Sequence, residues 1–272
     1  LLRGWHSELS ALLAKSSSVE QYSASVFLSV FNTEYQQYYT PEMALNDILR
    51  LKTLQSGSVN LMIHTYYNAE NALHLRLLQT KNPITLSSCL HVLENMGIQV
   101  LDEHPHHLPL NQGMQVYISD FSLKLPASPT PDYSPNLNYL EDAFLQINAK
   151  ALENDGFNRL ILLANISARE VNVLRAYWKF WRQAGAGYSQ PFIENCLAKH
   201  AILARQLIDL FYTYFSPFTR GDAKALLISM RSGLQSVIDL DEDKILNQFL
   251  AMIQATVRTN FFQANADGSP KS

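Results

Sequence analysis

Hydrophobic and polar positions along the chain follow two different periods. In "SVNLMIHTYY" and "ALHLRLLQT" apolar and polar residues alternate, which is typical of strands that bury one face. In "NPITLSSCLHVLENMG" the apolar residues return at helical spacing, and Gly97 stands where a left-handed C-terminal cap is expected. Two further strands are expected in "IQVLDEH" and "MQVYISDFSLKL". This order of elements predicts a small α+β sandwich with a mainly antiparallel sheet that is open on one face.

The segments on either side of this sandwich have helical periodicity. "PEMALNDILRLKTL" begins with a proline, which a first helical position tolerates, and "ISAREVNVLRAYWKFW" keeps its apolar residues on one stripe. Between them, "PASPTPDYSPN" carries four prolines in eleven residues and marks the clearest boundary. The expected divisions are a helical N-terminal segment over 1–56, the α+β domain over 57–125, a proline-rich linker over 126–136, a helical domain over 137–262 and a polar tail over 263–272.

Two S/D-x-x-E patterns predict where helices begin. Ser167 and Glu170 form a capping box, in which the hydroxyl accepts from an early amide and the carboxylate reaches back to the cap. Asp239 and Glu242 have the same spacing before "KILNQFLAMIQATV" and are expected to act in the same way.

Composition restricts the classes of partner. Hydrophobic residues make up 47% of the 272 residues, and the formal charge is −3. A globular chain without a basic surplus has little electrostatic reason to bind nucleic acid or an anionic membrane. The two cysteines lack metal-type spacing and are expected to be free thiols in a reducing compartment. No apolar run is long enough to span a membrane, so we expect a cytoplasmic protein, and the start without methionine suggests a piece of a longer one.

Candidate chemistry is sparse. The run "HPHHL" places His104, His106 and His107 near the end of a strand, but no second ligand cluster stands at metal-binding spacing, so an exposed strand end is the favoured interpretation. No glycine-rich dinucleotide or phosphate loop is present, and no catalytic residue can be named. The tyrosine cluster around Tyr35 and Tyr39 is better explained by core packing than by base stacking.

The stretch "ALENDGFNRL" concentrates acids, amides, a glycine and an arginine. Its nearest template is the EF-hand loop, which requires a glycine at its sixth position and oxygen ligands at its first and twelfth. With Gly156 sixth, Ala151 stands first and Leu162 twelfth, so both of these ligands would be apolar and the calcium interpretation fails. A polar joint between helices is the remaining interpretation.

Several motifs resemble the large bacterial NAD-specific glutamate dehydrogenases. "ALENDGFNRLILLANISAREVNVLRAYWKFWRQ" is similar to that family's E-N-D-G-F-N-R-L run and the S-x-R-E-V helix after it. "RGWHSELSALL", "VLENMGIQVLDEHPHHL", "VYISDFSL" and "LDEDKILNQFLAMIQATVRTNFFQ" resemble further family segments in the same order. The "HPHHL" run and the short region from Leu110 to Gly113 depart from the family pattern.

The resemblance implies that this chain is a regulatory and helical portion of an NAD-dependent glutamate dehydrogenase, with its catalytic domain beyond Ser272. It implies an ACT-like domain in a permuted arrangement, because the fourth strand must come from Leu61 to Tyr66. NAD would then be the cofactor of the full-length enzyme alone, and the partners would be its own catalytic domain, other subunits and an amino-acid effector. The alternative is a stand-alone amino-acid-binding or assembly module without catalytic activity.

Within "ENDGFNR" the resemblance implies structural roles. Glu153, Asn154 and Asp155 are expected to cap or join helices, Gly156 to relieve backbone strain, and Arg159 to pair with one of the acids.

An effector carboxylate would favour the helix start near Asn82, Thr85 and Ser87, where backbone amides and the helix dipole converge. The alternative is that Thr85 merely caps its own helix. The strands "VYISDFSL" and "HLRLLQ" are apolar enough to bind another domain or subunit if they stand at the sheet edges.

Overall fold

The structure is a computed structural model, and it describes residues 2–15, 31–55, 61–68, 70–80, 83–109, 115–127, 135–218 and 221–266. The chain forms two compact units. The sheet unit comprises Leu1–Leu90 and Gln99–Lys124, and the helical unit comprises His91–Ile98 and Leu125–Ser272. The helix α5 (Leu86–Asn95) therefore begins in one unit and ends in the other.

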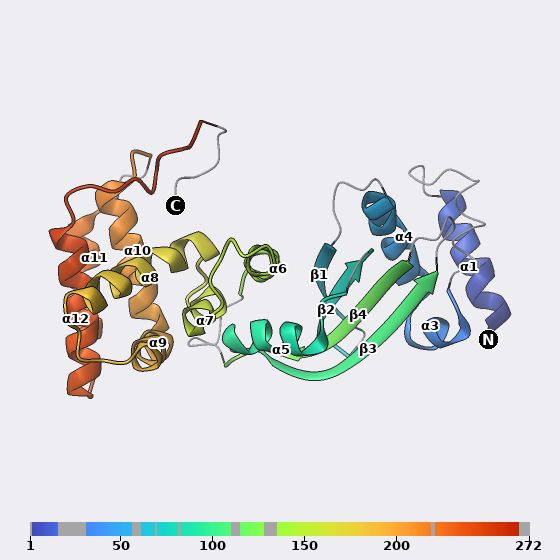
Figure 1. The fold of residues 1–272 in the computed structure, drawn as a ribbon, viewed down its shortest axis with the longest axis horizontal. Helices are drawn as coiled ribbons and strands as arrows, with labels where there is room; N and C mark the ends of the chain where they lie inside the picture. Colours follow the sequence, from blue (N-terminus) through green and yellow to red (C-terminus); the bar gives the residue numbers. More distant parts are fainter. Residues whose placement is uncertain are drawn as a thin grey trace. The chain divides into compact units, whose positions relative to one another are not determined.

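An antiparallel sheet organises the sheet unit (Figure 1). Its described strands follow the order β1-β2-β4-β3, with bounds β1 Leu61–Tyr67, β2 Leu73–Gln79, β3 Gln99–Pro109 and β4 Gln115–Lys124. The fourth strand comes from the upstream segment, as predicted, and this strand, β1, pairs with β2. The α+β fold class is confirmed.

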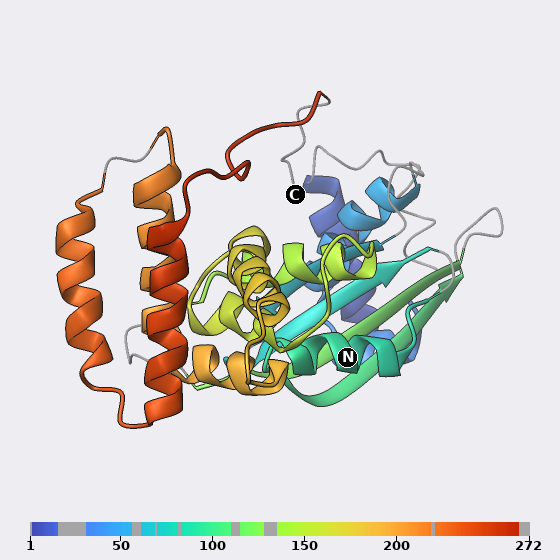
Figure 2. The same ribbon diagram turned by 60° about the vertical axis from the view of Figure 1, so that its left-hand side comes forward.

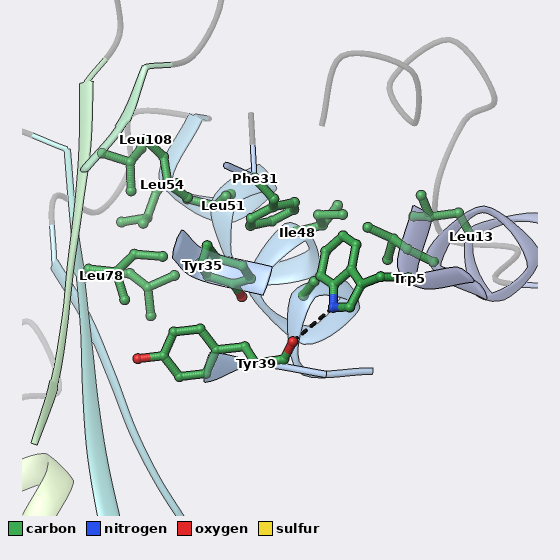
Figure 3. Packing of buried hydrophobic residues seen from close by; sticks show 14 residues of the cluster. Trp5, Leu13, Phe31, Tyr35, Tyr39, Ile48, Leu51, Leu54, Leu78 and Leu108 are labelled. Atoms are coloured by element: carbon green, nitrogen blue, oxygen red, sulfur yellow. Dashed lines mark hydrogen bonds between the residues drawn. The ribbon is translucent and has the colours of Figure 1, made fainter. Parts of the chain in front are cut away.

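Three N-terminal helices pack together with the sheet rather than forming a core of their own. They are α1 (Leu2–Lys15), α3 (Thr33–Tyr38) and α4 (Pro41–Gln55). The predicted stripe of α4 is buried, and the indole Nε1 of Trp5 donates to the carbonyl of Tyr39 at 2.8 Å (Figure 3). The shared core contains Trp5, Leu9, Leu13, Phe31, Tyr35, Tyr39, Ala44, Ile48, Leu51, Leu54, Leu78, Leu108, Val116 and Ile118.

Two expectations about the sheet are wrong. The central strands are buried on both faces: Leu75 and Phe121 lie on one face, and Arg76 and Leu78 lie on the other, whereas much of the edge strand β3 is exposed. The apolar strands "HLRLLQ" and "VYISDFSL" are β2 and β4, which occupy the centre of the sheet. Their backbone groups are paired on both sides, and their apolar composition reflects burial rather than a missing partner.

The strand predicted in "IQVLDEH" continues through the histidine-rich run to Pro109. This extension is possible because β3 is an edge strand, where the missing amide hydrogens of Pro105 and Pro109 do not interrupt a central ladder. A register shift between Val100 and Asp102 marks an irregularity in the same strand.

The helical unit consists of short and medium helices around its own core. Within the described residues they are α6 Leu137–Asn148, the 3₁₀ helix η2 Gly156–Asn158, α7 Arg159–Leu163, α8 Ala168–Gln183, α9 Gln190–Lys199, α10 Ala201–Phe215, α11 Ala223–Leu234 and α12 Leu240–Ala255. The helices α10, α11 and α12 lie side by side (Figures 1 and 2). Among the described residues, none of the helices could span a membrane.

The predicted helix ends are largely confirmed. Gly97 has φ of 77° and ends α5, with the amide of Ile98 donating to the carbonyl of Leu93. Ser167 and Glu170 form both halves of the capping box. The second box is wrong in one half: the carboxylate of Asp239 accepts from the amide of Glu242, but the Glu242 carboxylate binds Lys199 and His200 instead of reaching back. The central part of the proline-rich linker and the end of the polar tail lie outside the described residues.

Candidate functional site

The predicted effector residues lie at the start of α5. Thr85 and Ser87 are exposed, and Asn82 lies outside the described residues. The Thr85 Oγ1 atom accepts from the amide of Ser88 at 3.3 Å and lies 3.2 Å from the Ser87 hydroxyl. Thr85 therefore caps its own helix, and Ser87 shares a hydrogen bond with that cap.

The three predicted histidines do not converge. His106 is buried and lies against the ring of Tyr35, whereas His107 is exposed and stacks on Tyr117. His104 packs against Tyr38 with the two rings tilted by 32°. Neighbouring residues of a strand point to opposite faces. The expected exposed strand end is therefore wrong for His106, which is buried. The described part of the chain contains no group of three potential ligands that could hold a metal ion.

The sheet unit buries a charged network between the sheet and the N-terminal helices. Arg76 of β2 donates to Asp47 of α4 at 2.7 Å and to Asp120 of β4 at 3.1 Å, and all three side chains are buried. The Asp47 carboxylate also accepts from the Tyr35 hydroxyl at 2.6 Å. The guanidinium lies 3.9 Å from the ring centroid of Tyr39, so a cation–π contact accompanies the ion pairs.

The second carboxylate of this network has more partners than the arginine alone. Asp120 accepts from the Tyr66 hydroxyl at 2.5 Å and lies 3.0 Å from the Nδ1 atom of His74. Burial, followed by the nearby Asp47 carboxylate, raises the pKa of Tyr35 well above its ordinary value. These groups are held by one another, so the network is suited to fixing the α3 and α4 helices on the sheet rather than to proton transfer.

Sequence reasoning missed this network, although a signal was present. Arg76 stands between Leu75 and Leu77 of one apolar strand, and Asp120 stands beside Phe121 in another. An opposite pair of charges in neighbouring central strands favours a buried ion pair, because an unpaired charge at such a position is costly. The contribution of Asp47 from a helix far away in the chain had no signal of its own.

The "ENDGFNR" run forms the hub of the helical unit. The Asp155 carboxylate caps η2 and receives two bonds from Arg175 of α8, at 2.7 and 2.9 Å. The Arg175 Nη2 atom also donates to the Asn158 side chain at 2.8 Å, and Asn158 is fully buried. The polar joint therefore anchors α8 beside the η2 turn, which supports the structural interpretation of the run.

Two expectations about this run are wrong. Arg159 pairs with Glu194 of α9 at 4.0 Å and with Asn195 at 2.8 Å, instead of with an acid of the run. Gly156 does not have positive φ; a Cβ added there would lie 2.4 Å from the Glu194 Oε2 atom. Gly156 is thus required for close approach to α9. Burial raises the pKa of the Glu194 carboxyl.

A cavity of about 850 Å³ lies inside the helical unit, between α8, α10, α12 and the segment that follows α12. Its apolar wall includes Phe180, Phe211 and Phe261. Its basic side chains are Arg169, Arg175, Lys179 and Arg258, and its acidic side chain is Glu153.

This cavity does not fit a dinucleotide. Dinucleotide sites use glycines that let the backbone approach the pyrophosphate, and no glycine is among the residues that line the cavity.

Both cysteines are free and buried, and burial raises the pKa of each thiol to about 12, so neither is an activated nucleophile.

Comparison with known families accounts for most of the chain. The family model for the ACT3 domain of glutamate dehydrogenase matches residues 58–134. The family model for helical motif 3 of glutamate dehydrogenase matches residues 152–217. The model for the catalytic domain of bacterial NAD-glutamate dehydrogenase matches residues 229–272.

Named relatives agree with these matches. The NAD-specific glutamate dehydrogenases of Pseudomonas aeruginosa and Mycobacterium tuberculosis are each 32% identical to this chain, over 99% and 96% of its length. That of Halomonas elongata is 30% identical over the whole chain. In each case the chain spans 17% of the length of the relative. The chain corresponds to one region of the NAD-specific glutamate dehydrogenases.

The predicted resemblance is thereby confirmed. The expectation that the catalytic domain lies wholly beyond Ser272 is wrong, because the catalytic-domain model already matches residues 229–272. The sheet lies in the ACT3 match, and the "ENDGFNR" hub lies in the helical motif 3 match. The cavity is lined from both sides of a family boundary, by Arg169 and Phe211 from helical motif 3 and by Arg258 and Phe261 from the catalytic-domain match.

Proposed function

We propose that this chain is the regulatory and scaffolding region of an NAD-dependent glutamate dehydrogenase, which converts L-glutamate, NAD⁺ and water into 2-oxoglutarate, ammonium and NADH. The observation that supports the proposal is the ordered set of three glutamate dehydrogenase matches along one chain. Its partners would be the rest of the catalytic domain, whose family model matches residues 229–272 of this chain, and other subunits, in the cytoplasm.

The residues of this chain would contribute stability and position rather than chemistry. The described residues contain no metal-binding group, and the sequence contains no glycine-rich dinucleotide turn. The buried charges of the sheet unit and of the "ENDGFNR" hub form ion pairs within their own units. NAD would therefore bind to the full-length enzyme through residues outside this chain.

An amino-acid effector at the start of α5 is part of this proposal. The exposed side chains of Thr85 and Ser87 support it, because a carboxylate could reach them and the helix dipole together. Calorimetry with a panel of amino acids, on the wild type and on Asn82→Ala and Thr85→Val variants, tests it. Saturable binding that either substitution weakens supports the effector site, and no binding by the wild type contradicts it.

The alternative is a stand-alone binding or assembly module. An experiment with a chimaeric enzyme distinguishes it from the enzyme hypothesis. The corresponding region of the Pseudomonas aeruginosa enzyme is replaced by this chain, and glutamate-dependent formation of NADH is followed by absorbance. We expect activity from the chimaera and none from the 272-residue chain alone. A folded but inactive chimaera, or turnover by the chain alone, would contradict the proposal.

A further inference from the structure

We propose that the cavity of the helical unit binds a small organic anion, with a carboxylate or phosphate head group on an apolar body. The inference is independent of the dehydrogenase activity, because it rests on the lining of the cavity alone. A volume of about 850 Å³ falls within the range of roughly 300–1,000 Å³ that small-molecule sites occupy.

The charge of the lining favours an anion. Four basic side chains and one acidic side chain face the cavity. Arg175 is paired with Asp155, and Lys179 is paired with Glu153, so these two cations are already neutralised. Arg169 and Arg258 remain, and neither has a carboxylate partner at ion-pair distance among the described residues.

The two remaining arginines differ in how firmly they are held. Arg169 donates to the backbone carbonyl of Phe261, and its guanidinium lies 4.2 Å from the centroid of the Phe261 ring. It is thereby positioned in the wall. Arg258 is exposed at the segment after α12, where its guanidinium is available to a ligand. A guanidinium presents several donors that match the geometry of carboxylate and phosphate oxygens.

Other polar groups of the lining are already used. The Tyr177 hydroxyl lies 2.8 Å from the Thr256 hydroxyl, which donates to the carbonyl of Met252 at 2.8 Å. The side chain of Asn172 accepts from Arg175. Recognition of a head group therefore falls to the two arginines, and a cationic ligand would be repelled by them.

An apolar body is favoured by the rest of the lining. Phe180 and Val257 belong to the lining but are 63% and 86% exposed, so a bound alkyl or ring group would remove apolar surface from water. Phe211, Met252 and Phe261 continue this apolar wall. A simple inorganic ion would leave most of it uncovered.

The test measures binding of four probes to the 272-residue chain by calorimetry: hexanoate, hexyl phosphate, acetate and hexylammonium. We expect saturable binding of hexanoate, of hexyl phosphate or of both, with acetate and hexylammonium at least tenfold weaker. The stronger of the two anions identifies the head group. No binding of either long-chain anion, or equal binding of hexylammonium, overturns the inference.

Three variants locate the site. Arg258→Gln should weaken binding at least fivefold, whereas Arg231→Gln, which removes an exposed arginine of α11 outside the cavity, should leave it unchanged. Ala176→Trp adds bulk at an exposed lining position and should abolish binding while the far-UV circular dichroism remains that of the wild type. Equal affinity in the Arg258 and Arg231 variants, or retained binding in the Ala176 variant, places the probe elsewhere and overturns the assignment.

Discussion

Arg76 is the residue of the sheet unit whose replacement should have the most severe effect. It stands between two buried carboxylates, and removing one partner of a buried ion pair typically costs about 3–5 kcal/mol. We expect Arg76→Met to lower the free energy of unfolding of the sheet unit by this amount in a urea titration. Lys124→Met, an exposed cation of the same sheet, should change it by less than about 0.5 kcal/mol. A small effect of Arg76→Met on the free energy of unfolding would mean that the charged network contributes little to stability.

Gly156 offers a second test at the scale of the residue. An added methyl group would overlap the Glu194 carboxylate, which is buried, so Gly156→Ala should destabilise the helical unit by about 1–3 kcal/mol. The cost should shrink in a Glu194→Ala background, which removes the two overlapping Glu194 atoms and leaves the Arg159 Nη2 atom, 2.6 Å from the added Cβ, as the remaining close contact. Gly187→Ala is the matched control, because nothing lies within 4 Å of its added Cβ. An equal cost in both backgrounds would locate the clash elsewhere.

Helices are the elements whose ends the sequence predicted best. The cap of α8 depends on residues that are neighbours in the sequence, so Ser167 and Glu170 could be recognised from their spacing. The partners of Glu242 and Arg159 lie on other helices, 43 and 35 residues away respectively, and local spacing carries no information about them. The same reason explains why the lining of the cavity, which combines three helices and a later segment, was not predicted.

Ser167→Ala tests the cap of α8. The Ser167 side chain satisfies an early amide of the helix, so its removal should cost about 1 kcal/mol in a denaturant titration of the helical unit. Ser167→Thr keeps the oxygen acceptor and should lose only a few tenths of a kcal/mol. If alanine and threonine have the same effect, the hydroxyl does not stabilise the helix end.

The contact between α9 and α12 should depend on pH. Hydrogen bonds from His200 and Lys199 hold the pKa of the Glu242 carboxyl below its ordinary value of 4.5. The folded state therefore binds this proton more weakly than the unfolded state does. The stabilisation is complete above the ordinary pKa, and it is lost as the pH falls through the lower pKa of the folded state.

Glu242→Gln should abolish this component. The difference in free energy of unfolding between wild type and variant should be constant near pH 6 and shrink as the pH falls toward about 3. Asp243→Asn, at a half-buried neighbouring position whose side chain accepts from Asn247, is the control and should follow the wild type. A difference that grows as the pH falls would contradict the assigned direction of the shift.

At the scale of the whole molecule, the fold class and the family region could be predicted from the sequence. The packing of the N-terminal helices and the sheet into one unit could not. The period-two and helical patterns are local, and they indicated the strands and the helix between them. The packing of the N-terminal helices on the sheet depends on Arg76 and Asp47, whose contact spans 29 residues. Family motifs supplied the function class, because no catalytic group is visible in the chain.

The 272-residue chain should not bind NADH. Its sequence has no glycine-rich phosphate turn ahead of a helix, and the cavity of the helical unit has no glycine in its lining. Titration of the chain into NADH, followed by cofactor fluorescence, should give no saturable signal in the micromolar range. Saturable binding would show that a dinucleotide site of another kind is present.

The buried network of the sheet unit also constrains how this region can change during evolution. A substitution at Arg76 leaves two buried carboxylates without their cation, whereas a substitution at Asp47 or Asp120 leaves Arg76 with one carboxylate partner. Replacement of all three by apolar residues of similar volume can be neutral, because no charge then remains to be compensated. Homologous sequences that lack the arginine should therefore lack both carboxylates as well. A lineage that lost Arg76 first must have passed through an intermediate of low stability.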